Sequence, residues 1–366
     1  MGRKGQDLYK RMGIIPNRGL VNLAKHNYKG GEYTPLDMIC YKYWWDPVLG
    51  LIPMKMAPNL ITILGFVFAL SNIIVLFHVN PSLDRVLPPI YQTWGCFSFL
   101  FYMMMDAIDG RQARRTKSGS PLGQLLDHGC DSILSGVIAI VLASTLRVGL
   151  GFELVVLIAV SQVVFFIGQW EENYTGICRT CVLGLFGTTE YLLGFCILQI
   201  SVIFFDDIYL IQSLVFIGTV AVGIASSLYC ITNVLVNTPR ISTLVPLVPL
   251  VLLNILFGYF VSSTHFTSFV PFLSLTLLNS LLVIQMILST VTKLPINVAT
   301  QTLTILPLIC LIPLSSEYLL LIHTAIVALY FSQYIVRAVS QISHYLNIKV
   351  FTIYFKICLC FSLISS

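Results

Sequence analysis

Apolar stretches of about twenty residues recur along this chain, and they restrict its fold more than any other feature. A helix needs roughly twenty apolar residues to cross the hydrocarbon core of a membrane. Spans are predicted at residues 59–80, 87–106, 128–148, 152–169, 184–204, 209–231, 243–261, 268–291, 299–314 and 318–341. Only 10% of the residues are charged, whereas soluble domains carry about a quarter. The sequence therefore predicts an all-α, polytopic integral membrane protein with about ten transmembrane helices.

The basic residues predict an orientation for these spans. With the N-terminus in the cytosol, nine Lys and Arg before residue 58 and ten later ones fall on the cytosolic side, out of 21. Only Arg85 and Arg147 fall on the other side. Cytosolic loops of membrane proteins are enriched in Lys and Arg. This bias favours an even number of spans with both termini cytosolic.

Four aspartates lie between residues 106 and 131 of this weakly charged chain. Asp106 and Asp109 are three residues apart, and Asp127 and Asp131 are four apart, so each pair lies on one helix face. A turn at Ser118–Pro121 separates the two helices. Carboxylates gathered beside a membrane repel one another unless cations neutralise them, and Mg²⁺ and Mn²⁺ prefer oxygen ligands. The spacing predicts that the aspartates bind divalent cations such as Mg²⁺ or Mn²⁺.

The alternative is that these aspartates cap helix ends or pair with the nearby Arg111, Arg114 and Arg115. Capping or pairing accounts for one or two of the aspartates but not for the spacing of all four.

The residues between the aspartates suit a phosphorylated ligand. Gly110, Ala113 and Gly123 are small and leave room for a bulky ligand such as a nucleotide. The guanidinium of Arg114 offers planar donors for phosphate oxygens. His128 follows Asp127 directly and is a candidate for accepting a proton from an attacking hydroxyl. Its alternative role is that of a hydrogen-bonded neighbour.

The full pattern D-x2-D-G-x2-A-R-x8-G-x3-D-x3-D is filled at every defined position. It resembles the signature of the CDP-alcohol phosphatidyltransferase superfamily. The resemblance implies that an alcohol attacks the phosphorus distal to cytidine and displaces CMP. Two bound cations would hold the diphosphate and stabilise the charge that develops on it.

Further segments resemble the eukaryotic choline/ethanolaminephosphotransferase branch. They are Ala57 to Thr62 (APNLIT), Trp170-Glu171 followed by Tyr174, and Thr189-Glu190. The resemblance implies transfer of phosphocholine or phosphoethanolamine from CDP-choline or CDP-ethanolamine to diacylglycerol. The products would be phosphatidylcholine or phosphatidylethanolamine and CMP. It also implies His128 as the general base, Asn59 near the nucleotide, and an endoplasmic reticulum or Golgi membrane with the active site facing the cytosol.

Four residues outside the motif are weaker candidates for binding the headgroup. Trp170 and Tyr174 are suited to stacking on a quaternary ammonium, but they are equally typical of the interfacial aromatic belt. Glu171, together with its neighbour Glu172, would balance a cationic headgroup or simply be solvated. Glu190 lies in an apolar run, where a carboxylate is costly. It would position the headgroup or a metal-bound water, or else bond to neighbouring helices.

Four regions follow from these assignments. Residues 1–57 are basic and partly aromatic, which favours an amphipathic helix in the membrane interface over a solvated tail. Residues 58–231 form the catalytic helices, with the motif at 106–131. Residues 232–345 add helices that are candidates for a lipid chamber and for homodimer contacts. Residues 346–366 form a C-terminal tail, and no nucleic-acid partner is expected.

The cysteines predict no separate site. Ten are scattered, mostly within apolar runs, as small buried residues are. Cys178 and Cys181 form one CxxC pair, but no second pair lies nearby to complete a zinc site of four ligands.

Two other functions remain open from the sequence. One is a superfamily member that uses CDP-diacylglycerol and a polar alcohol such as inositol. The predicted ten spans and His128 argue against it. The other is a cation transporter, which would need acidic groups deep in several spans rather than gathered near one membrane face.

Overall fold

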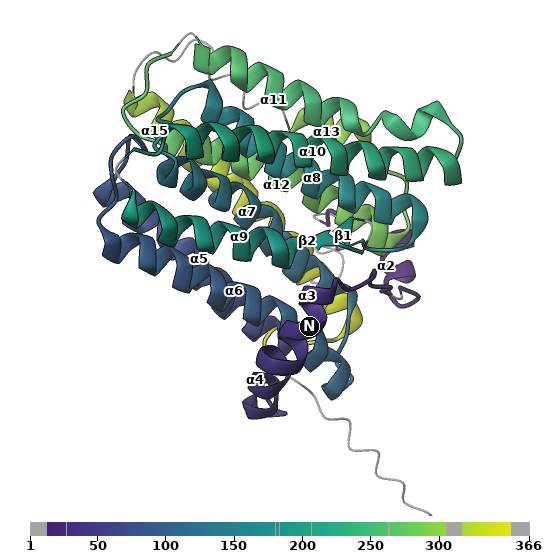
Figure 1. Cartoon of the computed structure of the whole chain (residues 1–366). Coiled ribbons are helices and arrows are strands. Elements are labelled where there is room, and N and C mark those ends of the chain that lie inside the picture. Colours follow the sequence, from purple (N-terminus) through teal and green to yellow (C-terminus); the bar gives the residue numbers. More distant parts are fainter. Residues whose placement is uncertain are drawn as a thin grey trace, which may run out of the picture.

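The structure is a computed structural model, and it describes residues 13–26, 28–179, 181–182, 184–205, 207–262, 264–304 and 317–352. Long helices dominate it (Figure 1). The first helices are α2 (Asn17–Leu23), α3 (Pro35–Cys40), η1 (Tyr41–Trp45), α4 (Asp46–Leu51), α5 (Pro58–Val79), α6 (Pro89–Thr116), α7 (Pro121–Thr145) and α8 (Phe152–Thr175). A short antiparallel pair, β1 (Cys181–Val182) and β2 (Phe186–Gly187), follows. The remaining helices are α9 (Thr188–Ser201), η2 (Val202–Phe204), α10 (Tyr209–Asn237), η3 (Ile241–Leu244), α11 (Leu247–Ser262), α12 (Val270–Thr292), α13 (Val298–Leu303) and α15 (Glu317–Leu346).

The protein is an all-helical, polytopic membrane protein, but the predicted count of about ten spans is wrong. Within the described residues, seven helical segments are long and apolar enough to cross a membrane: 58–79, 121–145, 152–175, 209–237, 241–262, 270–292 and 318–346. Helix α6 is not among them because its second half carries the polar motif, and α9 has only 14 residues. The predicted span 299–314 lies largely outside the described residues.

Local sequence sets the ends of the helices that carry the motif. Proline occupies the first turn of α5, α6 and α7, where its missing N–H costs no hydrogen bond. Helix α6 ends at Lys117, whose left-handed backbone (φ 54°) stops the helix. Ser120 then caps α7, its hydroxyl accepting a hydrogen bond from the backbone N–H of Gly123 at 3.1 Å. The chain therefore reverses within a few residues and places α7 beside α6.

Helices α7 and α12 form the centre of the bundle, and most of their residues are buried. The hydroxyl of Ser280 on α12 donates to the backbone oxygen of Ser132 on α7 at 2.9 Å. Gln162 on α8 donates to the same oxygen at 2.9 Å. At Gly136 on α7, an added Cβ would lie 2.5 Å from the Cγ2 of Thr276. Close packing of this kind needs small residues, as is usual between membrane helices.

Both described ends of the chain lie at the same end of the bundle as the motif. Asn59, at the start of α5, donates to the backbone oxygen of Val350 at 2.7 Å. Gln341 exchanges two hydrogen bonds with the backbone of Ile15, at 2.7 and 2.9 Å. The two ends therefore share one side of the bundle, a conclusion that does not depend on the number of spans.

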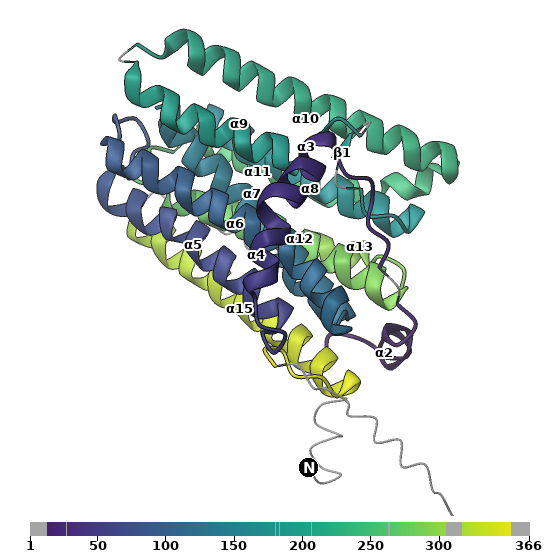
Figure 2. The same ribbon diagram turned by 60° about the horizontal axis from the view of Figure 1, so that its bottom comes forward.

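The segment 35–51 forms consecutive helices, α3, η1 and α4, which lie across the longer helices in Figure 2. Their outer face exposes Met38, Ile39 and Tyr43, an apolar surface suited to the membrane interface. On the inner face, Arg111 of α6 pairs with Asp46 at 2.5 Å, and Arg115 donates to the backbone oxygens of Leu49 (2.8 Å) and Ile52 (2.6 Å). These three helices therefore pack against α6 along their inner face.

Candidate active site

The reversal between α6 and α7 brings the motif aspartates together. Carboxylate oxygens of Asp106, Asp109 and Asp127 all lie within 4.8 Å of one another. Asp131 lies one turn further along α7, and its Oδ1 accepts a hydrogen bond from the Tyr102 hydroxyl of α6. The group of three therefore contains the pair Asp106 and Asp109 together with one member of the second pair, Asp127.

Among the described residues, one buried oxygen of these carboxylates has no hydrogen-bond partner. The Thr62 hydroxyl of α5 donates to Oδ2 of Asp109, which is 4% exposed. Oδ1 of Asp127 is buried and has no hydrogen-bond partner among the described residues. A buried carboxylate oxygen without a donor is costly unless a cation or ligand meets it. The donor set, all hard oxygen atoms, fits a divalent ion such as Mg²⁺ or Mn²⁺.

The three arginines beside the aspartates have different surroundings. Arg111 and Arg115 bind the helix at 35–51, as described above, and do not compensate the aspartates. Arg114 is exposed, and its Nη1 lies 3.7 Å from the position that a Cβ on Gly110 would take. Its guanidinium thus lies beside the carboxylates with donors free to meet a phosphate.

Neither motif glycine is required by the packing of the protein itself. A Cβ on Gly123 would come no closer than 3.6 Å, to the Oδ1 of Asn59, and the closest atom for Gly110 is 3.7 Å away. These are ordinary contact distances, and neither glycine has a left-handed backbone. Glycine at these positions instead keeps space open beside the aspartates. Ala113 lies one turn beyond Gly110 on α6 and is half-buried.

His128 is held by α8 rather than by its neighbour Asp127. Its Nδ1 lies 3.0 Å from Oε1 of Gln169. Because an amide oxygen only accepts, Nδ1 carries the proton and Nε2 carries the lone pair. Nε2 is 4.0 Å from Oδ2 of Asp127. With Nδ1 bonded to Gln169, Nε2 is the ring nitrogen toward the carboxylate cluster and is positioned to accept a proton.

Glu172 is a buried neighbour of His128 that the sequence left as a solvated or headgroup-balancing residue. It is only 3% exposed, and its Oε1 accepts a hydrogen bond from Gln124 of α7 at 2.7 Å. Gln169 and Glu172 are three residues apart on α8 and therefore share a face. That spacing of polar residues in an apolar helix was the signal available in the sequence.

His26 and Tyr28 cover this region. His26 bonds to Oε1 of Gln124 at 2.6 Å, and the Tyr28 ring meets His128 edge-on at 5.9 Å. Burial, followed by the neighbouring Cys178 and Asp127, raises the pKa of the Tyr28 hydroxyl, which therefore stays protonated.

The four weaker candidates for headgroup binding make contacts with other parts of the protein. Trp170 is fully buried, donates to the Thr243 backbone oxygen at 2.9 Å and meets Tyr174 edge-on at 5.6 Å. Glu171, also fully buried, pairs with Arg179 at 3.1 Å and accepts from Asn233 at 2.5 Å.

Glu190 contributes to the start of a helix. Its Oε2 accepts from the backbone N–H of Gly187 at 2.8 Å and so caps α9. The neighbouring Thr189 donates to Asp37 of α3 at 2.5 Å, which ties the N-terminal helix to α9.

Comparison with known proteins agrees with this geometry. Residues 55–225 match the CDP-alcohol phosphatidyltransferase family. The chain is 34% identical over 228 residues to an uncharacterized CDP-alcohol phosphatidyltransferase class-I family protein 2 from Dictyostelium discoideum, covering 60% of this chain and 54% of that protein. It is 35% identical over 180 residues to choline/ethanolaminephosphotransferase 2 of Arabidopsis thaliana, covering 49% and 45%. With cholinephosphotransferase 1 of Saccharomyces cerevisiae the identity is 30% over 195 residues, covering 52% and 48%.

The chain spans about half the length of the curated relatives that it matches. The matched residues 55–225 contain α5 to α9 and most of α10, and with them all four aspartates, Arg114 and His128. These residues, which make up a little under half of the chain, are therefore similar to the CDP-alcohol phosphatidyltransferase family.

Proposed function

We propose that this protein transfers phosphocholine or phosphoethanolamine from the CDP-alcohol to diacylglycerol, releasing CMP and forming phosphatidylcholine or phosphatidylethanolamine. The observation that carries the proposal is the meeting of three motif aspartates, Asp106, Asp109 and Asp127, at one junction, with a buried Asp127 oxygen that no described donor satisfies. The similarity to choline/ethanolaminephosphotransferases supports the choice of substrate.

The aspartates would hold two Mg²⁺ or Mn²⁺ ions, which when bound neutralise the diphosphate and stabilise the charge of its transition state. Thr62 fixes the rotamer of Asp109, and Tyr102 fixes that of Asp131, so both carboxylates are preorganised. The space beside Gly110, Ala113 and Gly123 admits the nucleotide and its diphosphate. Asn59 borders that space, and Arg114 donates to the phosphate oxygens.

His128 accepts the proton of the diacylglycerol hydroxyl as its oxygen attacks the phosphorus distal to cytidine. A new bond forms between that oxygen and phosphorus, and the bond from phosphorus to the CMP oxygen breaks. Gln169 keeps the Nδ1 proton in place, so Nε2 is the basic nitrogen. Trp170, Glu171, Tyr174 and Glu190 have partners within the protein, and we assign them to the scaffold around the site.

We place the protein in an endoplasmic reticulum or Golgi membrane with the site facing the cytosol, where the water-soluble donor is available. The basic residues at the motif end of α6, Arg111, Arg114 and Arg115, support this orientation. The lipid acceptor then reaches the site from the bilayer.

One assay separates this function from its alternatives. Purified protein is given CDP-choline and CDP-ethanolamine side by side with diacylglycerol and Mg²⁺, and in a further arm CDP-diacylglycerol with inositol. We expect CMP release with diacylglycerol and a choline or ethanolamine donor, and none in the presence of a chelator. Activity only in the inositol arm would favour the other superfamily reaction. Cation flux in vesicles without any CMP release would favour a transporter.

A further inference from the structure

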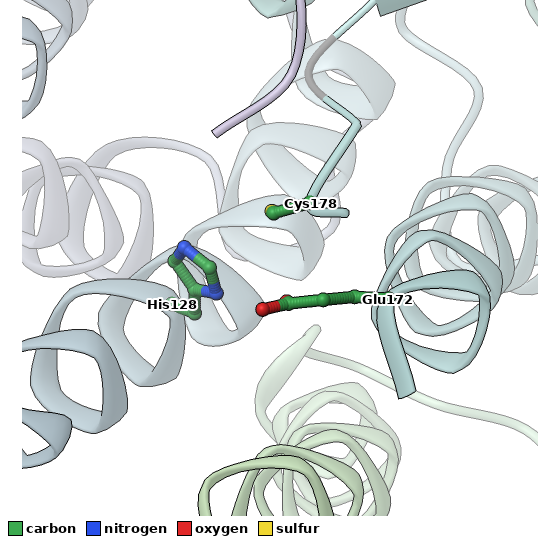
Figure 3. A group of neighbouring side chains, drawn as sticks. All are labelled: His128, Glu172 and Cys178. Carbon is green, nitrogen blue, oxygen red and sulfur yellow. The ribbon is translucent and has the colours of Figure 1, made fainter. Parts of the chain in front are cut away.

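A second group of potential ligands lies beside the aspartates. His128 of α7, Glu172 of α8 and Cys178 of the following loop each offer one ligand atom, and these atoms lie within 4.8 Å of one another. Figure 3 shows the three side chains meeting from three separate segments, with the Glu172 carboxylate directed toward His128. All three residues are buried, at 7%, 3% and 5% exposed.

Glu172 points into this group with an unused oxygen. Its Oε1 accepts from Gln124, but Oε2 has no hydrogen-bond partner among the described residues. A carboxylate oxygen buried in this way requires either a proton or a cation. The unpartnered Oε2 is therefore a second observation that indicates a bound cation, in addition to the short distances among the three side chains.

The backbone fixes Cys178 at this position. Its N–H donates to the backbone oxygen of Lys29 at 3.0 Å, and Gly30 forms a bridge with it. Cys181, the other cysteine of the CxxC pair, is directed elsewhere, since its thiol donates to the backbone oxygen of Glu32 at 3.3 Å. The loop thus presents one cysteine of the pair, and not both, to His128 and Glu172.

We propose that His128, Glu172 and Cys178 form a second metal site, selective for a thiophilic divalent ion of the Zn²⁺ class. One nitrogen, one oxygen and one sulfur suit Zn²⁺ or Co²⁺, whereas Mg²⁺ prefers oxygen alone. Ligands of a tetrahedral zinc ion are about 3.3–3.8 Å apart, so the three side chains need to move together by at most about 1.5 Å. Three protein ligands leave the fourth position to water.

Binding is a balanced exchange of a metal ion for a proton. The Cys178 thiol loses its proton to solvent, and the thiolate, the carboxylate and the imidazole lone pair bind the ion. One consequence rests on the proposed function: an ion here takes up the imidazole that would otherwise accept the substrate proton. Zn²⁺ then inhibits the Mg²⁺-dependent reaction from a site of its own.

The site is tested with Co²⁺, because a thiolate bound to Co²⁺ gives a charge-transfer absorption that oxygen ligands do not. Full-length protein in detergent is titrated with Co²⁺ in the presence of excess Mg²⁺. We expect one equivalent to produce this band, and Zn²⁺ to remove it by displacement. The band is expected to disappear in Cys178→Ser and to remain in the matched control Cys181→Ser.

If Cys178→Ser misfolds, the site can still be tested with Glu172→Gln, because this variant keeps the Cys178 thiol. We expect its Co²⁺ affinity to fall at least tenfold while the band persists at saturation. Absence of the band in the wild-type protein overturns the site. Loss of the band in Cys181→Ser, or an unchanged affinity in Glu172→Gln, assigns the ion to the CxxC pair and overturns it equally.

Activity distinguishes this inference from the proposed function. Zn²⁺ is expected to inhibit CMP release by the wild-type protein at least tenfold more strongly than by Cys178→Ser. If no variant releases CMP but the Co²⁺ band appears as described, the metal site stands and the proposed function fails.

Discussion

At the scale of single residues, Asp127 differs from the other motif aspartates because its Oδ1 is buried and has no hydrogen-bond partner among the described residues. Replacing Asp106, Asp109, Asp127 or Asp131 by Ala should each reduce CMP release by more than about a hundredfold. A bound cation contributes several kcal/mol of transition-state stabilisation, and each 1.4 kcal/mol is a tenfold change in rate. Retained activity in most of the four variants would refute the site.

His128→Ala should lower turnover far more than it weakens CDP-alcohol binding. General acid–base catalysis is worth about 10²- to 10⁴-fold in rate, whereas the imidazole makes no required contact with the nucleotide in this account. Steady-state kinetics paired with a direct CDP-choline binding measurement tests this. An equal loss in both quantities would indicate a structural role for His128.

Two glycines of α7 give opposite expectations. Gly123→Ala meets no atom closer than 3.6 Å, so the thermal midpoint should hold while the KM for CDP-choline rises by about tenfold, or about 1.4 kcal/mol. Gly136→Ala forces a Cβ to 2.5 Å from Thr276 and should cost about 1–3 kcal/mol of stability. Thermal unfolding and substrate titration of both variants separate the effects. A Gly123→Ala variant with normal KM contradicts a nucleotide beside this position.

At the scale of elements, the N-terminal segment 35–51 is held by arginines that the sequence analysis considered as ion-pair partners of the aspartates. Arg115→Met removes two charged hydrogen bonds to backbone oxygens at the end of α4, each worth about 1.5–3 kcal/mol. Protease cleavage between residues 46 and 57 should become faster, with a lower thermal midpoint. Lys55→Met is the control, since it removes an exposed positive charge from the same region. Equal cleavage in the two variants would show that Arg115 does not anchor the helix.

The motif helices could be predicted from sequence because their signals are local. Proline at the helix starts and the three- and four-residue spacing of the aspartates required no knowledge of distant contacts. The roles of Arg111 and Arg115 were not predictable, because each bonds to a segment whose position follows from the tertiary fold. Glu172 was missed for the same reason: only the packing of α8 on α7 brings it to His128 and Cys178.

At the scale of the whole molecule, hydropathy identified a polytopic membrane protein but overcounted its spans. Helix α6 is amphiphilic because it carries Asp106, Asp109 and Gln112 within its length, and α9 is too short to meet the same criterion. The contacts of Ile15 with Gln341 and of Asn59 with Val350 place both described ends on the motif side, whatever the number of membrane spans. The span number consequently no longer argues against CDP-diacylglycerol as a substrate, and the assay with inositol decides that point.

The central claim is that the carboxylates of α6 and α7 together hold two divalent ions on a CDP-alcohol. Its most direct test is the number of Mn²⁺ ions bound per chain, measured by electron paramagnetic resonance with CDP-choline present. We expect two bound ions for the wild-type protein and a loss of binding in Asp127→Ala, with the helical circular dichroism unchanged. Mn²⁺ binding that is absent from the wild-type protein, or that is the same in Asp127→Ala, would contradict the account.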